Sequence, residues 1–214
     1  MRSISKPGKR PRSSAASKPP GFIAPQLCEL VSTPPEGPEW VHEAKLDGYR
    51  TQLHVRGGKA VCYSRRGLDW THRFPETASA AEALDDCVID GEVCAVDAQG
   101  LPSFAGLTDA LKAKSTGKLV YFVFDMMWGS SENLSPLPLL ARKAALKKAL
   151  AKLERKDKKR FAFVDHHKGD GAAMLEAACD MKLEGIVSKR IDAPYRPGDR
   201  SGIWTKAKCR PSQE

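Results

Sequence analysis

The chain has 214 residues, 41% of them hydrophobic, and a formal net charge of +9. This length allows one substantial core or two small ones. No apolar run approaches the ~20 residues that a membrane-spanning helix needs, which excludes that class of membrane protein. The basic amino terminus lacks the apolar stretch of a secretory signal. The sequence therefore predicts a cytoplasmic protein with no membrane partner.

The positive charge is concentrated in two segments. Residues 1–20 contain six basic side chains and no acidic one, and residues 141–160 contain ten basic and two acidic ones, so the rest of the chain is net negative. Such segments attract phosphate backbones without reading sequence. The alternative is ordinary solvation, with a disordered tail in the first segment and a solvated helix face in the second.

The cysteine and histidine patterns favour neither a metal site nor disulfides. No CxxC pair occurs, and the six cysteines do not cluster with the five histidines. We expect reduced, mostly buried thiols and no zinc. The adjacent pair His166 and His167 is expected in a solvated turn or at a strand end. The cysteines are Cys28, Cys62, Cys87, Cys94, Cys179 and Cys209.

The first third of the chain divides into three segments. Residues 1–20, rich in Ser, Pro, Lys and Arg, predict a disordered basic arm. Residues 21–38 contain four prolines and predict an irregular lead-in. Residues 40–64 alternate polar and apolar side chains around Gly57 and Gly58, which predicts a β-hairpin.

The rest of the chain mixes helix and strand patterns. Residues 74–84 have helical spacing, and residues 87–96 and 119–127 are apolar and rich in strand-forming side chains. Residues 139–153 predict a long helix with a leucine stripe opposite a lysine-rich face. Residues 172–181 predict another helix. Strands and helices without regular alternation, and without an internal repeat, indicate an α+β fold.

One octapeptide carries the first chemical signal. In Glu43–Arg50, Lys45 has a carboxylate two residues away on either side, with Gly48 and Arg50 behind it. A lysine in such surroundings is a candidate amine nucleophile at a phosphate site. The motif is short, and taken alone its alternative is an exposed turn.

Five further segments follow in a fixed order. They are Ser64–Gly67, Asp90–Val93, Tyr121–Asp125, Glu184–Lys189 and Trp204–Lys208. Together with the octapeptide they resemble the motif series of the lysine-dependent nucleotidyltransferases, the superfamily of ATP-dependent DNA ligases and RNA-capping enzymes. Leu68–Pro75 and Asp192–Arg196 look like the ligase domain of bacterial DNA ligase D. The resemblance runs from about Phe22 to Cys209.

The resemblance implies an α+β adenylation (nucleotidyltransferase) domain of the ATP-grasp-like ligase type, with two antiparallel sheets flanked by helices around an ATP cleft. This domain is expected over residues 21–209, between the basic arm at 1–20 and a tail at 210–214. Complete ligases of the family continue with an OB-fold domain. The few residues after Lys208 cannot build one, so we expect no OB-fold domain and weak nick sealing.

By resemblance, Lys45 attacks the α-phosphorus of ATP and holds AMP as a phosphoramidate. Lys206 and Lys208 share one face of a strand, and the family places them at the α-phosphate. Arg200 matches an arginine that assists at the phosphates. The alternatives are a basic strand facing solvent for the two lysines and an ordinary loop position for the arginine.

Carboxylates are expected to serve the ribose and the metal. Glu92 is assigned to the ribose hydroxyls and to metal, and Glu184 to metal, with Mg²⁺ or Mn²⁺ as the cofactor beside ATP. Asp47 is expected to assist the later steps near metal or the DNA end. The alternatives are salt-bridged structural glutamates and a capping role for Asp47.

The remaining candidates surround the nucleoside. Phe124 is expected to stack on the adenine, because it matches the Phe-Asp pair of the family. Phe122 shares its strand face, and the alternative is that one of the two belongs to the core. The resemblance implies that Glu43 receives the adenine amino group and that Arg50 meets the ribose or sugar-phosphate side. Arg65 is expected to meet the nucleotide and the 5′-phosphate of a nick.

The sequence therefore predicts an ATP-dependent DNA ligase, or its adenylation domain, that forms lysyl-AMP for nick sealing in repair and recombination. Its expected partners are duplex DNA with nicks or ends and end-joining proteins, and we expect a nucleoid-associated monomer. One alternative is an RNA ligase or capping-type enzyme, which the ligase D-like segments disfavour. Another is a nucleic-acid-binding or recruiting module with a vestigial site, which the complete set of motif residues disfavours.

Overall fold

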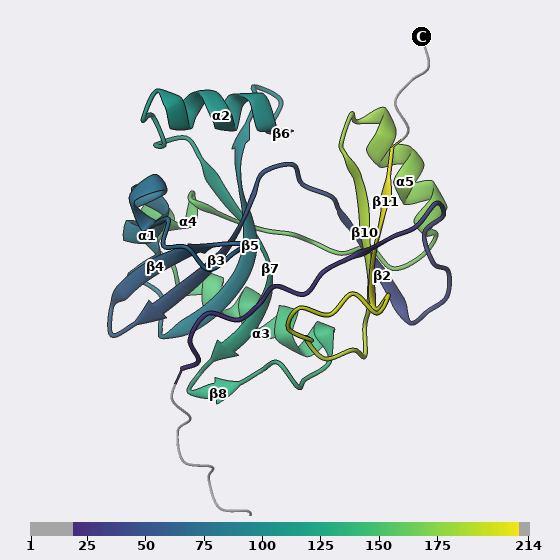
Figure 1. Ribbon diagram of the computed structural model, residues 1–214, viewed down its shortest axis with the longest axis horizontal. Helices are drawn as coiled ribbons and strands as arrows, with labels where there is room; N and C mark the ends of the chain where they lie inside the picture. Colours follow the sequence, from purple (N-terminus) through teal and green to yellow (C-terminus); the bar gives the residue numbers. More distant parts are fainter. Residues whose placement is uncertain (1–18, 210–214) are drawn as a thin grey trace, which may run out of the picture.

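The computed structural model describes residues 19–209 and consists of two β-sheets with helices packed against them (Figure 1). The predicted tail at 210–214, and all of the predicted arm except Pro19 and Pro20, lie outside the described residues. None of the helices in the described part is long and apolar enough to span a membrane. The α+β prediction is confirmed.

The smaller sheet carries helix α5 (Gly171–Asp180) on its outer side (Figure 1). Ala178 of this helix packs on Ile186 and Ala207 of the sheet. The sheet has the strand order β1 (Glu29–Leu30), β11 (Trp204–Lys208), β10 (Gly185–Arg190) and β2 (Trp40–Ala44).

The larger sheet contains most of the described strands. Its main path is β4 (Lys59–Ser64), β3 (Tyr49–Arg56), β5 (Cys87–Val96), β7 (Val120–Gly129) and β8 (Glu132–Asn133). Two short strands lie off this path, β6 (Pro102–Ser103) beside β5 and β9 (Phe161–Phe163) beside β7.

Short helices surround the larger sheet, and α3 packs on β7. Leu146 and Leu150 of α3 join the main core with Phe74 and the buried side chains of β3, β5 and β7. The helical segments are η1 (Thr71–Arg73), α1 (Pro75–Ala81), α2 (Phe104–Lys112), α3 (Leu139–Ala151) and α4 (Arg155–Lys158).

The predicted hairpin is correct for its second part only. β3 and β4 pair antiparallel around Gly57 and Gly58, as expected, but Trp40–Ala44 pairs with β10 in the other sheet. Alternation shows that a strand has one buried face and does not reveal which sheet it joins. The chain therefore passes from the smaller sheet to the larger between Ala44 and Tyr49.

The expectation of two antiparallel sheets is nearly correct. Each sheet contains one parallel pairing, β1 with β11 in the smaller sheet and β7 with β9 in the larger. All other strand pairings in the described chain are antiparallel. Both exceptions involve strands of two or three residues, which carry too few positions to show a pattern.

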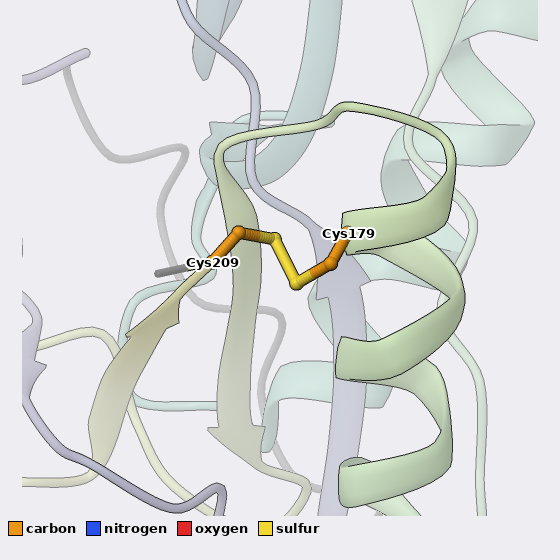
Figure 2. Close-up of a disulfide and its surroundings, with 2 residues drawn as sticks. All are labelled: Cys179 and Cys209. Carbon is orange, nitrogen blue, oxygen red and sulfur yellow. A yellow bond between two sulfur atoms is a disulfide. The ribbon is translucent and has the colours of Figure 1, made fainter. Parts of the chain in front are cut away.

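The prediction that all cysteines are reduced is wrong for one pair. Cys179, in the last turn of α5, forms a disulfide with Cys209, which follows β11 (Figure 2). Their Cα atoms are 5.4 Å apart although 30 positions separate them in the sequence. This separation suits a disulfide, and only the fold creates it. The other four cysteines are free, three of them buried.

The basic segment at 141–160 is less exposed than its composition suggests. Arg142 and Lys143 are buried in ion pairs with Asp125 and Glu43, so two of its ten charges are neutralised inside the protein. The exposed Lys147 lies 4.0 Å from Asp165. Two of the ten charges are thus unavailable to a phosphate backbone, whereas most of the others are exposed.

Candidate active site between the two sheets

Lys45 lies where the chain crosses between the sheets, directly after β2. Its backbone N–H donates to the carbonyl of Gly185 at 2.9 Å, which fixes the crossing against β10. Glycine is needed at two positions beside it. A side chain on Gly48 would meet the Val93 carbonyl oxygen at 2.4 Å, and Gly185 has a φ of +142°.

A cavity of about 330 Å³ opens beside this crossing, a volume suited to a small-molecule ligand. Its walls come from strands of both sheets. Among the described residues, six cationic side chains and two carboxylates line it, so an anionic ligand suits it best. The predicted site residues that line the cavity are Glu43, Lys45, Arg50, Arg65, Glu92, Phe124, Arg200 and Lys206.

Glu184 connects Lys45 to Lys208 at one side of the cavity. The Lys45 Nζ contacts Glu184 Oε2, and the Lys208 Nζ lies 2.8 Å from Glu184 Oε1. Burial alone would raise the pKa of the Glu184 carboxyl, but the hydrogen bonds from Lys208 and Lys45 outweigh it and hold that pKa below its usual value. Glu184 therefore stays ionised and holds the amine of Lys45 in place.

Three predicted site residues do not line the cavity. Glu184 contacts Lys45, which lines the cavity, and Lys208 contacts Glu184 with its side chain about half exposed. Asp47 is exposed beside the crossing and caps no helix, which leaves it accessible to a large substrate.

Glu92 is the most perturbed carboxyl group of the cavity. Its Oε1 accepts a hydrogen bond from the Gly48 N–H at 3.1 Å. Burial raises the pKa of the Glu92 carboxyl to about 7, although the nearby charges of Arg50 and Lys45 oppose this. Near neutral pH its charge therefore responds to small changes in its surroundings.

Arg50 lines the cavity but is already held by the protein. Its guanidinium donates to both oxygens of the buried Asp90 at 2.8 and 2.7 Å, and also to the Gln26 carbonyl at 3.0 Å. The hydroxyl of Tyr195 donates to the same carboxylate at 2.7 Å. This network ties the lead-in segment, the larger sheet and the loop before β11 together at the cavity wall.

Aromatic rings and buried ions form another part of the cavity. Phe124 and Trp204 pack edge to face, and both belong to the apolar cluster between the sheets. The Lys189 Nζ lies 4.4 Å from the Phe124 ring centre and 2.5 Å from Glu43 Oε2. Burial lowers the pKa of the Lys189 amine, against the opposing charge of Glu43.

Sequence reasoning missed three buried cations near the cavity. Lys189 ends one of the motifs, and the basic composition around Lys143 and Arg142 predicts surface positions, yet all three are buried. Arg142 makes two 2.8 Å hydrogen bonds to Asp125, next to Phe124. The available signal was their position, because Arg142 and Lys143 lie between Leu139 and Leu146 on the buried face of the helix.

The fold and this site define the class of the protein. Residues 25–208 match the family model of the ATP dependent DNA ligase domain. The chain therefore belongs to the family of ATP-dependent DNA ligase domains.

Two curated relatives and one solved structure illustrate the similarity. The chain is 36% identical over 211 residues to the multifunctional non-homologous end joining protein LigD of Pseudomonas aeruginosa, which covers 98% of this chain and 24% of that protein. It is 30% identical over 186 residues to the SPbeta prophage-derived DNA ligase-like protein LigB of Bacillus subtilis, with 86% of this chain and 67% of that protein covered. The structure of mycobacterial DNA ligase D complexed with ATP and MES superposes with a TM-score of 0.75 at 26% identity, covering 87% of this chain and 60% of that one.

The chain thus spans about a quarter of the length of the LigD proteins from Pseudomonas aeruginosa and Mycolicibacterium smegmatis. The match lies within the ligase domain of such proteins, as the likeness to the isolated ligase domain of Mycobacterium tuberculosis LigD indicates.

Proposed function

We propose that this chain transfers AMP from ATP to Lys45 and passes it to the 5′-phosphate of a DNA end or nick. The observation that carries the proposal is the position of Lys45, at the edge of a cationic cavity and held by the ionised Glu184. An amine fixed beside a phosphate-binding cavity is the arrangement that covalent nucleotidyl transfer requires.

In the first step the Lys45 ammonium gives a proton to solvent and the neutral amine attacks the α-phosphorus. A nitrogen–phosphorus bond forms, the bond to pyrophosphate breaks, and the nitrogen releases a second proton to solvent. Charge accumulates on the phosphate oxygens as pyrophosphate leaves. Lys206, Arg200 and Arg65 line the cavity and would stabilise that charge. Lys208 would act beside them from its contact with Glu184, and Asp47 would assist the later steps at the DNA end.

The nucleoside would lie against the aromatic part of the cavity. Phe124 would stack on the adenine, and the Glu43 carboxylate would accept a hydrogen bond from the 6-amino group. Glu92 would meet the ribose hydroxyls, with Arg50 on the sugar-phosphate side. These assignments rest on the resemblance together with the shared cavity.

A divalent cation fits this arrangement as a partner of ATP. No group of three or more His, Cys, Asp or Glu side chains gathers in the described part of the chain to hold a metal alone. Mg²⁺ is commonly bound by one or two carboxylates together with phosphate oxygens and water, so Glu92 and Glu184 suffice. Bound there, Mg²⁺ or Mn²⁺ would neutralise phosphate charge.

The test of this function is an intact-mass measurement after incubation with ATP and Mg²⁺. We expect one covalent AMP per chain, released by acid because phosphoramidates are acid-labile. A DNA duplex with a 5′-phosphate at a nick should accept the AMP and remove it from the protein. Failure to form any adduct, in a protein that is folded, would overturn the proposal.

The pH dependence of adenylation should report Glu92. Below pH 7 this carboxyl is mostly protonated in the free protein, and only the anion binds a metal or accepts two ribose hydroxyls. We therefore expect kcat/KM for ATP to rise through about pH 7, and Glu92→Gln to remove that inflection.

Glu132→Gln, a change at an exposed carboxyl on β8, serves as the control and should keep the wild-type profile. Any rise in kcat/KM that does not come from Glu92 would survive in both variants. An unchanged inflection in Glu92→Gln would show that another group titrates.

Duplex DNA and end-joining proteins are the partners that we propose, together with action as a nucleoid-associated monomer on DNA ends. The proposal draws on the relatives, because LigD of Pseudomonas aeruginosa is named for non-homologous end joining.

We also propose that the fold is of the ATP-grasp-like ligase type. The two sheets of the chain support this proposal.

The six basic residues within 1–20 should contribute to DNA affinity through counterion release. Replacing all six by glutamine keeps the length and should reduce the slope of log affinity against log salt by up to about 5, since each phosphate contact adds about 0.9. Fluorescence anisotropy with a nicked duplex measures it. Adenylation without DNA should be unchanged, and an identical slope would show that the segment does not contact DNA.

A further inference from the structure

We infer that Lys143 is a positioning residue that sets the Glu43 carboxylate against the Phe124 strand and thereby makes the cavity selective for a purine with a 6-amino group. The inference rests on the proposed function and extends it. It assigns a role to a buried lysine on α3 that meets neither the phosphates nor Lys45.

The three donors of the Lys143 ammonium are all used within the protein. Its Nζ lies 2.5 Å from Glu43 Oε1, donates to the Val164 carbonyl at 2.8 Å, and lies 3.5 Å from the Phe124 carbonyl oxygen. An ammonium has three hydrogens, so none is left for a ligand. Lys143 therefore acts on the cavity only through the groups that it holds.

Those groups belong to different sheets. Glu43 lies on β2 of the smaller sheet, whereas Phe124 lies on β7 of the larger one and Val164 follows β9 beside it. The contact thus crosses between the sheets. It fixes the carboxylate relative to the backbone of the residue proposed to stack on the base, so the acceptor and the aromatic platform keep one separation.

Glu43 is held from both sides and still has capacity for a ligand. Lys189 lies 2.5 Å from Oε2, so each carboxylate oxygen has its own ammonium. A carboxylate oxygen accepts two hydrogen bonds, which leaves one position on each for a donor in the cavity. The hydrogens of a ligand amine can occupy these remaining acceptor positions.

The selectivity follows from this geometry. A 6-amino group supplies the missing donor to Glu43, whereas a purine lacking it leaves the acceptor unpaired. A keto group at the same position would place an acceptor against an acceptor. Sites built to pair a substrate group discriminate strongly against analogues that lack it.

The experiment compares kcat/KM of adenylation for ATP and for purine riboside triphosphate, which lacks only the 6-amino group. We expect wild-type protein to prefer ATP by at least about tenfold. Lys143→Met should reduce this ratio to within about twofold of unity by lowering kcat/KM for ATP, through KM, while leaving the analogue nearly unchanged. A general loss of structure would lower kcat/KM equally for both nucleotides and would leave their ratio unchanged.

Lys147→Met is the matched control. Lys147 lies one turn further along α3, is exposed, and contacts the same Phe163 ring as Lys143, at 5.4 Å against 4.7 Å. It does not contact Glu43, so its variant should keep the wild-type ratio. Glu43→Gln should lose the preference as Lys143→Met does, and the double variant should be no worse than either single one.

If Lys143→Met does not fold, Lys143→Gln provides the same comparison, because it removes the charge and keeps a hydrogen-bond donor. Retention of the full ATP preference in a folded Lys143 variant, or absence of any preference in the wild type, would overturn the inference. Absence of adenylation with both nucleotides would instead overturn the proposed function. Equilibrium binding of ATP and of the analogue by calorimetry would then still measure the ratio.

Discussion

Lys45→Arg is expected to abolish the covalent AMP adduct, with a loss of at least about a thousandfold in labelling rate. Arginine keeps the positive charge and can still pair with Glu184, but its guanidinium stays protonated and is not a nucleophile. The change therefore separates the charge of Lys45 from its chemistry. Intact-mass analysis after incubation with ATP and Mg²⁺ measures the adduct.

Lys59→Arg is the control, because Lys59 is an exposed lysine at the start of β4 and lies outside the cavity. It should label as the wild type does. Acid treatment should release AMP from both labelled proteins. Labelling of Lys45→Arg at the parental rate would move the nucleophile to another residue.

The candidate site residues could be located from the sequence because the proposed chemistry restricts their identity. The proposed chemistry requires the residue types of Lys45, Lys206 and Glu92, and each lies in a short segment whose order along the chain is itself informative. The structure brings these three side chains to one cavity, although Lys45 follows β2, Lys206 lies on β11 of the smaller sheet and Glu92 lies on β5 of the larger sheet. The grouping confirms the expectation that the segments share a cleft, and the role of each side chain remains a proposal.

The strands themselves were predicted more reliably than their partners. The strand expected at 87–96 has those bounds, and the helix expected at 172–181 begins and ends one residue earlier. The separation of Trp40–Ala44 from the hairpin could not be predicted, because alternation is a local property and strand pairing is not. The same limit applies to Cys179 and Cys209, which meet only once α5 and β11 are packed.

The burial of the cations near the cavity could not be predicted from the sequence either. Lys143 and its partner Glu43 are 100 positions apart, so nothing local marks the pair. Composition alone assigns a lysine in a basic helix to the surface, since unpaired charges are rarely buried. Lys143 is buried because it pairs with Glu43, a carboxylate in the wall of the cavity. Arg142 and Lys143 therefore support the site from outside its motifs, whereas Lys189 ends one of them.

Glu184→Gln is expected to lower the rate of adenylation at saturating ATP by about a hundredfold or more, with a small effect on KM. Glutamine keeps the size of the side chain and one acceptor oxygen, but loses the charge that pairs with both Lys45 and Lys208. The amine of Lys45 then lacks the anion that orients it. Single-turnover labelling at saturating ATP measures this rate.

The same variant tests the proposed metal role of Glu184. If this carboxylate also helps to bind Mg²⁺, the Mg²⁺ concentration for half-maximal labelling should rise in Glu184→Gln, whereas a purely orienting role would leave it unchanged. Glu176→Gln, at an exposed glutamate on α5, should match the wild type in both measurements. A wild-type labelling rate in Glu184→Gln would contradict the assignment, because the link from Lys45 through Glu184 to Lys208 would then serve only to hold the strand ends together.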